Sequence, residues 1–353
     1  SEVILKAWHA WGESCVEHLH GMFAFAIWDT RTRTLFMARD RLGIKPLYWS
    51  RNDARLRFAS SPQALLAAGD VDTTIDAVAL HHLFTLHAVV PAPRTILQGV
   101  RKLAPGHWLR VAAEGQLVEQ RYWHLPATRP ERSLADRDWL DAIHAALRGA
   151  VARRNEVADV PVGVLLSGGL DSSLLVALLA EVGVSDLRTF SVGFEDQPEE
   201  AGNEFAYSDA VAARYATRHR KFLVPDSEVL QRLPEAVDAM AEPMFGQDAV
   251  AFYLLAEQVS REIKVVQSGQ GADEVFAGYF WYPRMHAETQ GSRLERFRKH
   301  YFDRDHEEYL RLVEGPYRGA DHTAEAVAAM LAEPDADSFL DAVLRMDVTT
   351  LIV

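Results

Sequence analysis

The sequence predicts a two-domain α/β protein in which a part rich in antiparallel strands precedes a part built on a parallel sheet. The length of 353 residues corresponds to about two domains of ~150 residues each. Short apolar or alternating segments, separated by turn residues, fill residues 1–125, whereas strands alternate with helices over residues 137–353. A polar segment with two prolines at 126–136 lies between the two patterns and is the predicted linker.

The composition excludes several classes of protein. Hydrophobic residues make up 48% and charged residues 25% of the chain, as in ordinary globular domains and unlike disordered or collagen-like chains. The net charge of −13 disfavours binding to nucleic acid. No apolar run approaches the ~18 residues of a membrane span. The one cysteine, Cys15, allows neither an internal disulfide nor a cysteine-based zinc site. We therefore expect a cytoplasmic protein.

The first part is predicted to start with an amphipathic helix, because apolar residues recur at helical spacing over 3–11. The strands expected after this helix lie at 23–28, 35–39, 46–50, 56–60, 108–112 and 120–124, with one helix at 76–87. Turn residues such as Glu114-Gly115 separate them, which indicates an antiparallel sheet. The chain begins inside a helical pattern at Ser1 and ends on an apolar run at Val353. We expect it to be a fragment of a longer protein.

In the second part of the chain, predicted strands alternate with predicted helices. Strands are expected at 162–166, 188–194, 219–224 and 263–267, and helices at 139–151, 172–182, 207–215 and 228–240. Such alternation is typical of βαβ units, whose strands run parallel. Because these sheets bind ligands beyond the carboxyl ends of their strands, the segments that follow the strands are candidates for a site.

The most informative segment follows the first buried strand of the second part. It reads SGGLDS from Ser167 to Ser172 and leads directly into a helix. Gly168 and Gly169 lack Cβ atoms, so backbone N–H groups there can point at an anion, and the helix adds its positive N-terminal end. Asp171 next to a phosphate requires a cation between them, which points to Mg²⁺. No Gly-Lys-Ser/Thr follows, so this is not a Walker loop.

SGGLDS resembles the pyrophosphate-binding loop of the N-type ATP pyrophosphatases, which cleave ATP to AMP and pyrophosphate. The segment QSGQGADEVFAGY at 267–279 also follows a buried strand. Together with TFSVGF at 189–194, it resembles the synthetase domain of the asparagine synthase family. The segments HGMFAFAIWD at 20–29 and ARDRLGIKPLYW at 38–49 are similar to the glutaminase domain of the same family. The resemblance covers essentially the whole chain, in the order of the family.

The resemblance implies a glutamine-hydrolysing carbon–nitrogen ligase with two sites. Residues 1–125 would be the later part of a class II glutamine amidotransferase domain, an N-terminal nucleophile α+β sandwich. Residues 137–353 would be a parallel-sheet ATP pyrophosphatase domain, of the adenine nucleotide α-hydrolase type, truncated at its C-terminus. Ammonia released from glutamine would reach the second site, where ATP has adenylated a carboxylate. The implied partners are ATP, glutamine and a carboxylate acceptor, and a homodimer is compatible with this scheme.

The resemblance also assigns roles to individual residues. Asp171 and Asp273 correspond to the Mg²⁺ ligands, and Gln270 stands where the family has a catalytic glutamate. The residues expected at the pyrophosphate are Ser167, Gly168, Gly169, Asp171 and Ser172, and those expected at the adenosine are Leu165, Val192, Ser268 and Gly269. The cysteine nucleophile of the family lies upstream of Ser1, so none is expected in this chain. Cys15 is expected to be a packing residue.

Two features bear on the acceptor. Asparagine-forming members carry glutamate where this chain has Gln270, and a neutral amide cannot act as a general base. Either Gln270 only makes a hydrogen bond within its loop, or the acceptor is not free aspartate. The aromatic segment GYFWYP at 278–283 either packs in a core or lines a pocket for a larger acceptor. With 268–277 it most resembles the subgroup that amidates the dipeptide N-acetylglutaminylglutamine.

Alternatives stay open at this point. The chain could come from an ordinary asparagine synthetase, from an ATP pyrophosphatase that uses free ammonia, or from a non-catalytic nucleotide-binding remnant. His81, His82 and His87 share a helical stretch with no Glu or Cys at ligand spacing, so core or surface roles are expected for them rather than a metal site. Arg39-Asp40-Arg41 is expected to form a structural ion-pair group.

Overall fold

The structure is a computed structural model that describes all residues except 1, 54, 132, 196–202, 245–247 and 352–353. It contains two compact units. Unit 1 comprises Ser1–Arg129, Ala241–Met244 and Glu274–Val353, and unit 2 comprises Pro130–Met240 and Phe245–Asp273. The sequence pattern places 274–353 with the second part of the chain, whereas in the structure this helical segment packs with the first part.

The first 129 residues of unit 1 form two antiparallel sheets rather than one. The four-stranded sheet has the order β1-β2-β6-β7, with strands Ala24–Asp29, Thr34–Arg39, His107–Val111 and Leu117–Arg121. The three-stranded sheet has the order β4-β3-β5, with strands Leu56–Ala59, Tyr48–Arg51 and Arg101–Lys102. Every strand predicted for this part is present, shifted by a few residues at most. Strand β5 was not predicted, because it has only two residues and so cannot show an alternation of apolar and polar side chains.

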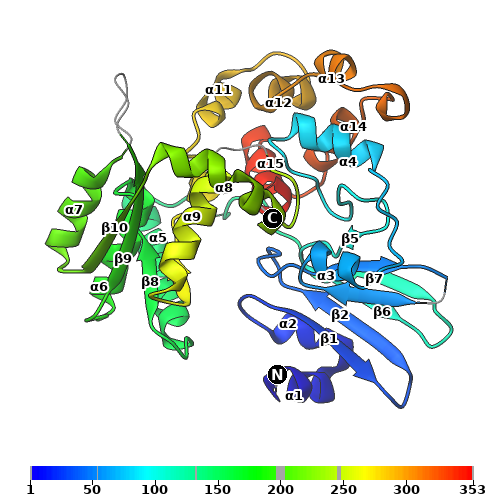
Figure 1. Cartoon of the computed structure of the whole chain (residues 1–353), viewed down its shortest axis with the longest axis horizontal. Coiled ribbons are helices and arrows are strands. Elements are labelled where there is room, and N and C mark those ends of the chain that lie inside the picture. The colour runs from blue at the N-terminus through cyan, green and yellow to red at the C-terminus, as the bar shows by residue number, and fades with distance from the viewer. Residues whose placement is uncertain (1, 54, 132, 196–202, 245–247, 352–353) are drawn as a thin grey trace. The chain divides into compact units, whose positions relative to one another are not determined.

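The four-stranded sheet is covered on both faces (Figure 1). Alternate residues of β2 point to opposite sides, so Phe36 faces the helices α1 (Glu2–Trp11) and α2 (Cys15–His18). Met37 faces the three-stranded sheet and packs with Trp49. This layering agrees with the sandwich that the resemblance implies. The short helices η1 (Gly12–Ser14) and α3 (Pro62–Ala67) complete this part.

Cys15 and the Arg39-Asp40 pair have structural roles. Cys15 is fully buried in the cluster beneath α1, and burial raises the pKa of its thiol to about 11. The guanidinium of Arg39 donates to the carbonyl oxygens of Gly43, Lys45 and Leu103. The carboxylate of Asp40 accepts from the backbone N–H groups of Phe23, Ile44 and Lys45. The expected ion-pair group is therefore a set of side-chain to backbone hydrogen bonds, which satisfy these buried charges.

The helical segment of unit 1 packs against α4 (Ala77–Thr85), as Figure 1 shows. Its elements are α11 (Trp281–Ala287), α12 (Arg293–Tyr301), α13 (His306–Leu312), η2 (Gly315–Tyr317), α14 (His322–Leu331), α15 (Phe339–Met346) and η3 (Asp347–Leu351). Tyr282 is fully buried in their shared core, and Tyr279 and Trp281 pack against it. Most of the GYFWYP segment is therefore core, and Phe280 is its exposed aromatic residue.

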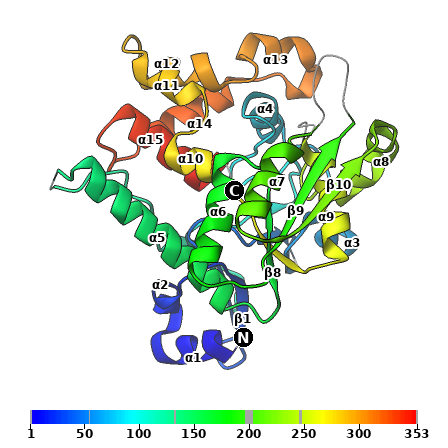
Figure 2. The ribbon, with the colours of Figure 1, turned by 90° about the vertical axis from the view of Figure 1, so that its left-hand side faces the viewer.

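Unit 2 is a four-stranded parallel sheet with the order β10-β9-β8-β11, which confirms the predicted βαβ arrangement. Its strands are β8 (Val162–Leu165), β9 (Arg188–Phe194), β10 (Arg218–Val224) and β11 (Val265–Gln267). One face is covered by α5 (Asp136–Glu156), α6 (Leu170–Glu181) and α7 (Phe205–Arg214), and the other by α8 (Asp226–Ala239) and α9 (Asp248–Ser260) (Figure 2). Within the described residues, no helix has both the length and the apolar character to cross a membrane.

Candidate functional site

The strand order of unit 2 creates a switch point between β8 and β11. From β8 the chain moves outward through β9 and β10 and then returns to the opposite side of β8 to form β11. Val164 pairs with Gln267, so both strands end at the same edge of the sheet. Open α/β sheets bind their ligands at this kind of edge. The segments 167–172 and 268–273, which were predicted to form the site, both begin there.

The first loop is held in shape by its own serines. The Oγ atoms of Ser167 and Ser172 lie 3.0 Å apart. Ser167 Oγ also accepts from the N–H of Gly169 at 3.2 Å, and Ser172 Oγ donates to the carbonyl oxygen of Gly169 at 3.3 Å. Helix α6 begins at Leu170, so the loop leads directly into a helix N-terminus, where backbone N–H groups favour an anion.

Gly168 is required by both its conformation and its surroundings. Its φ is +93°, and a Cβ atom there would lie 2.5 Å from Tyr207 Cβ and 2.6 Å from the backbone nitrogen of Ser208. Gly183 is a matched control, since its φ is +89° but a Cβ atom would meet nothing within 4 Å. We expect Gly168→Ala to lower the free energy of unfolding by about 1–3 kcal/mol more than Gly183→Ala, because only the first adds a clash to the backbone strain. Urea denaturation measures both losses, and equal losses would contradict this packing.

The second loop lies against the first. A Cβ atom on Gly269 would lie 2.8 Å from Asp171 Cβ and 3.1 Å from the backbone nitrogen of Ser172, so only glycine allows this approach. Ser268 Oγ accepts from the N–H of Gln270 at 3.3 Å, and the short helix α10 (Ala272–Phe276) begins directly after the loop. The structure therefore brings together the two loops that the sequence places about 100 residues apart.

Asp171 and Asp273 are electrostatically coupled. The pKa of Asp171 is raised above its ordinary value, first by loss of solvent and then by repulsion from Asp273. Two carboxylates that repel each other favour a cation between them, and carboxylate oxygens, together with phosphate oxygens of a substrate, are the ligands of protein-bound Mg²⁺. The donor set and its electrostatics fit the magnesium ion that the sequence predicts.

The remaining predicted residues have different surroundings. Leu165 and Val192 are partly buried and pack against a cluster that contains Phe190 and Leu255, so they form the apolar floor of this edge. Gln270 is exposed, and its Oε1 accepts from Ser268 Oγ at 3.4 Å. This contact lies within the loop and is compatible with both roles considered for Gln270.

Two groups next to the site were not singled out from the sequence. The buried hydroxyl of Ser191 donates to the carbonyl oxygen of Leu166, which is the last residue before the first loop. Tyr207 and Ser208 of α7 lie against Gly168. Ser191 lies within the TFSVGF segment, so its position was open to prediction. The contact with α7 depends on tertiary packing and has no signal in the sequence.

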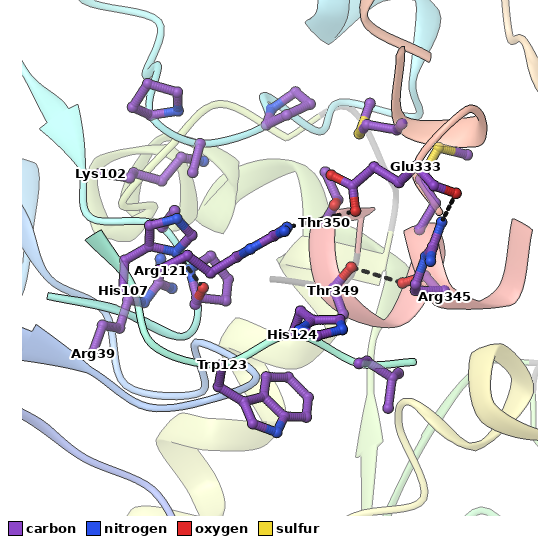
Figure 3. Close-up of a pocket in the computed structure, with 18 of the residues that line it drawn as sticks. Arg39, Lys102, His107, Arg121, Trp123, His124, Glu333, Arg345, Thr349 and Thr350 are labelled. Atoms are coloured by element: carbon purple, nitrogen blue, oxygen red, sulfur yellow. Dashed lines mark hydrogen bonds and ion pairs between the residues drawn. The ribbon is translucent and has the colours of Figure 1, made fainter. Parts of the chain in front are cut away.

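A separate cavity of about 520 Å³ lies in unit 1 and contains none of the predicted site residues (Figure 3). Six arginine and lysine side chains line it, and several of them have partners. Lys102 Nζ lies 2.9 Å from Glu242 Oε1, and Arg121 lies 3.6 Å from Glu333. Arg345 donates to the carbonyl oxygen of Glu333 at 3.0 Å. The two ion pairs neutralise part of the basic charge in the lining.

Comparison with protein families gives two matches in chain order. The model described as "Glutamine amidotransferase domain" matches residues 1–123, and the model described as "Asparagine synthase" matches residues 142–353. The loops of unit 2 lie within the second match. The order of the two matches agrees with the resemblance found in the sequence.

Individual proteins show the same likeness. A Mycobacterium tuberculosis protein named "Putative asparagine synthetase [glutamine-hydrolyzing]" is 38% identical over 80% of this chain and 43% of its own length. A Bacillus subtilis protein named "Asparagine synthetase [glutamine-hydrolyzing] 3" is 31% identical over 80% of this chain and 47% of its own length. Among solved structures, an NH3-dependent NAD synthetase from Campylobacter jejuni matches 39% of this chain and 60% of its own, with 16% identity and a TM-score of 0.29. The chain thus spans about half the length of the curated relatives it matches. Because the asparagine synthase model matches more than half of its residues, the chain belongs to the asparagine synthase family.

Proposed function

We propose that this protein is an ATP- and glutamine-dependent amide synthetase. It would adenylate an acceptor carboxylate, release pyrophosphate, and then join the activated carboxyl carbon to ammonia derived from glutamine. The observation that carries the proposal is the meeting of the two loops at the switch point of unit 2, with Asp171 and Asp273 electrostatically coupled there. The test is whether the full-length gene product forms AMP and pyrophosphate from ATP when a carboxylate acceptor is present.

The first loop would hold the phosphates of ATP. Gly168 and Gly169 keep side chains away from the backbone of the loop, and the start of α6 supplies N–H groups and a favourable dipole. The hydroxyl of Ser167 would be a further donor, and that of Ser172 would become one by exchanging its bond to the carbonyl oxygen of Gly169. Because these dipoles are in place before the reaction, they would stabilise the negative charge that develops on the departing pyrophosphate.

Asp171 and Asp273 would hold Mg²⁺ at this edge of the sheet. Bound there, the ion would neutralise charge on the triphosphate and on the leaving group. The protein contributes the spacing of the two carboxylates, because Gly269 allows the second loop to approach Asp171. The contribution of Leu165 and Val192 would be the apolar floor next to the adenosine.

The acceptor oxygen would attack the α-phosphorus of ATP, and the bond from that phosphorus to pyrophosphate would break. Ammonia would then attack the acyl carbon, AMP would leave with the bonding electrons, and the amide nitrogen would lose a proton. The amide of Gln270 cannot take that proton. This difference from the asparagine-forming members, together with the resemblance of residues 268–283 to the subgroup that amidates N-acetylglutaminylglutamine, supports that dipeptide as the acceptor. Free aspartate is the second candidate, and the names of the curated relatives favour it.

Gln270→Glu tests whether this one position decides the acceptor. A missing general base, once restored, would raise the rate by about 10²- to 10⁴-fold. We expect the asparagine-forming activity of the full-length variant to rise by less than about tenfold, because the proposed acceptor differs from aspartate in size and in the groups it presents. Product analysis of asparagine, with Gln270→Ala as the control, measures this. A gain in the range of a restored base would show that position 270 sets the acceptor.

A further inference from the structure

Three side chains with metal-binding atoms converge in the helical segment of unit 1. His81 belongs to α4, His306 is the first residue of α13, and Asp321 directly precedes α14. One ligand atom from each lies within 4.8 Å of the others. His81 Nε2 lies 3.4 Å from His306 Nδ1 and 3.8 Å from Asp321 Oδ1. The sequence could not show this group, because His81 and His306 are 225 residues apart.

The distance between the two ring nitrogens fits a shared metal ion better than a direct hydrogen bond. Hydrogen bonds with nitrogen donors span about 2.7–3.2 Å, and the observed separation of 3.4 Å is longer. Two nitrogen ligands that are each about 2.0–2.1 Å from a tetrahedral zinc ion lie about 3.3 Å apart. The carboxylate oxygen of Asp321, 3.8 Å from His81, reaches a third tetrahedral position with a small side-chain movement.

His81 is a buried polar ring that packs against the ring of Tyr309. Its side chain is 1% exposed, and its Nδ1 has no hydrogen-bond partner among the described residues. Two nearby histidines differ in this respect, because His82 Nδ1 lies 3.0 Å from Thr323 Oγ1 and His87 Nδ1, just beyond α4, lies 3.0 Å from Asp303 Oδ1. Burying a polar ring is costly unless its polar atoms are bonded, and a bond from Nε2 to a metal would offset part of that cost.

We propose that His81, His306 and Asp321 bind a Zn²⁺ ion. Imidazole nitrogen and carboxylate oxygen are common zinc ligands, and three protein ligands leave a fourth position for water. His306 and Asp321 are partly exposed, so solvent reaches this side of the cluster. The ion joins α4 to the starts of α13 and α14 and stabilises their packing. The proposal is independent of the proposed ligase function, because none of the three residues belongs to the loops of unit 2.

Calorimetric titration with ZnCl2 tests the site on the full chain after dialysis against EDTA. The variant His306→Ala removes a ligand that is partly exposed. Asp321→Asn removes the charge but keeps the N-cap that Asp321 Oδ1 provides to the N–H of Ala324. His286→Ala is the matched control, because it removes an exposed histidine of α11 outside the cluster. Circular dichroism checks that each variant is folded.

We expect one Zn²⁺ per chain in the wild type and in His286→Ala, and binding at least about tenfold weaker in each ligand variant. Zn²⁺ should raise the melting temperature of the wild type and the control but not of His306→Ala. Excess Mg²⁺ should not weaken the binding of Zn²⁺ to this cluster, since Mg²⁺ prefers oxygen ligands. Absence of binding in the wild type would overturn the proposal, and so would equal binding in the wild type and both ligand variants.

Discussion

Replacement of Asp171 or Asp273 by asparagine is expected to abolish pyrophosphate release from Mg²⁺-ATP by the full-length gene product. Asparagine keeps the size of the side chain but removes the charge that would hold the cation. Loss of charge stabilisation at a leaving group costs several kcal/mol, or about 10²- to 10³-fold in rate or more. A coupled pyrophosphate assay with saturating ATP measures the loss. Asp159→Asn, at an exposed position of the same unit, should have the rate of the wild type.

A second readout separates this role from a structural one. Repulsion from Asp273 contributes to the raised pKa of Asp171, so Asp273→Asn should lower the pKa of the Asp171 carboxyl. Relief of that repulsion should leave the free energy of unfolding unchanged or slightly higher. Normal pyrophosphate release in both variants would contradict the assignment of the metal ligands. Loss of activity together with loss of stability would show that the carboxylates hold the fold instead.

The contribution of Asp347 to the stability of the chain is expected to decrease as the pH rises from about 4 to about 7. This carboxyl is 1% exposed. Burial raises its pKa from 3.8 to about 7, although hydrogen bonds from Tyr282 and Tyr301 act in the opposite direction. Over this range the folded state retains a proton on Asp347 that the unfolded state has lost, so the contribution of this group to the free energy of unfolding decreases as the pH rises. At about 1.4 kcal/mol per pKa unit, the full loss amounts to about 4 kcal/mol at most.

Asp347→Asn tests this origin of the pH dependence. The amide does not titrate, so the stability of the wild type relative to that of the variant should decrease by several kcal/mol as the pH rises across this window. Urea denaturation at pH 4.5 and pH 7 gives the two values for each protein. Asp159→Asn corrects for the effect of removing an exposed carboxylate. Parallel pH profiles for wild type and Asp347→Asn would rule out this carboxyl as the source.

The predictability of the fold differs between its parts for physical reasons. The strand β9 was predicted with its bounds because a run of β-branched and aromatic residues ends in turn residues at both sides. The packing of the helical segment 274–353 with α4 was not predicted. Its helices have apolar faces, but a face does not specify which partner will cover it. The hydrogen bond between Tyr282 and Asp347 could not be predicted for the same reason. The two residues are 65 positions apart, and only the folded chain brings them together in one core.

In the candidate site, too, some features could be predicted from the sequence and others required the tertiary structure. Gly168 and Asp171 were identified from one short segment, since a glycine-rich turn between a strand and a helix has few other uses. The neighbouring position of Asp273 followed from the rule that parallel strands end at one edge. The sequence could not decide whether Leu165 and Val192 touch a ligand or pack beneath that edge of the sheet. The periodicity of a strand shows which face a residue lies on, but not how far it is from a ligand. The contact of Tyr207 with Gly168 required the tertiary structure.

The most direct measurement of the central claim is pyrophosphate release by the full-length gene product with Mg²⁺-ATP and glutamine. Aspartate and N-acetylglutaminylglutamine are supplied in parallel reactions, and AMP is quantified alongside pyrophosphate. The predicted result is equal amounts of AMP and pyrophosphate with the dipeptide and little of either with aspartate. Release with aspartate alone would identify an asparagine synthetase and contradict the proposed acceptor. The absence of AMP and pyrophosphate with both acceptors would contradict the ligase itself.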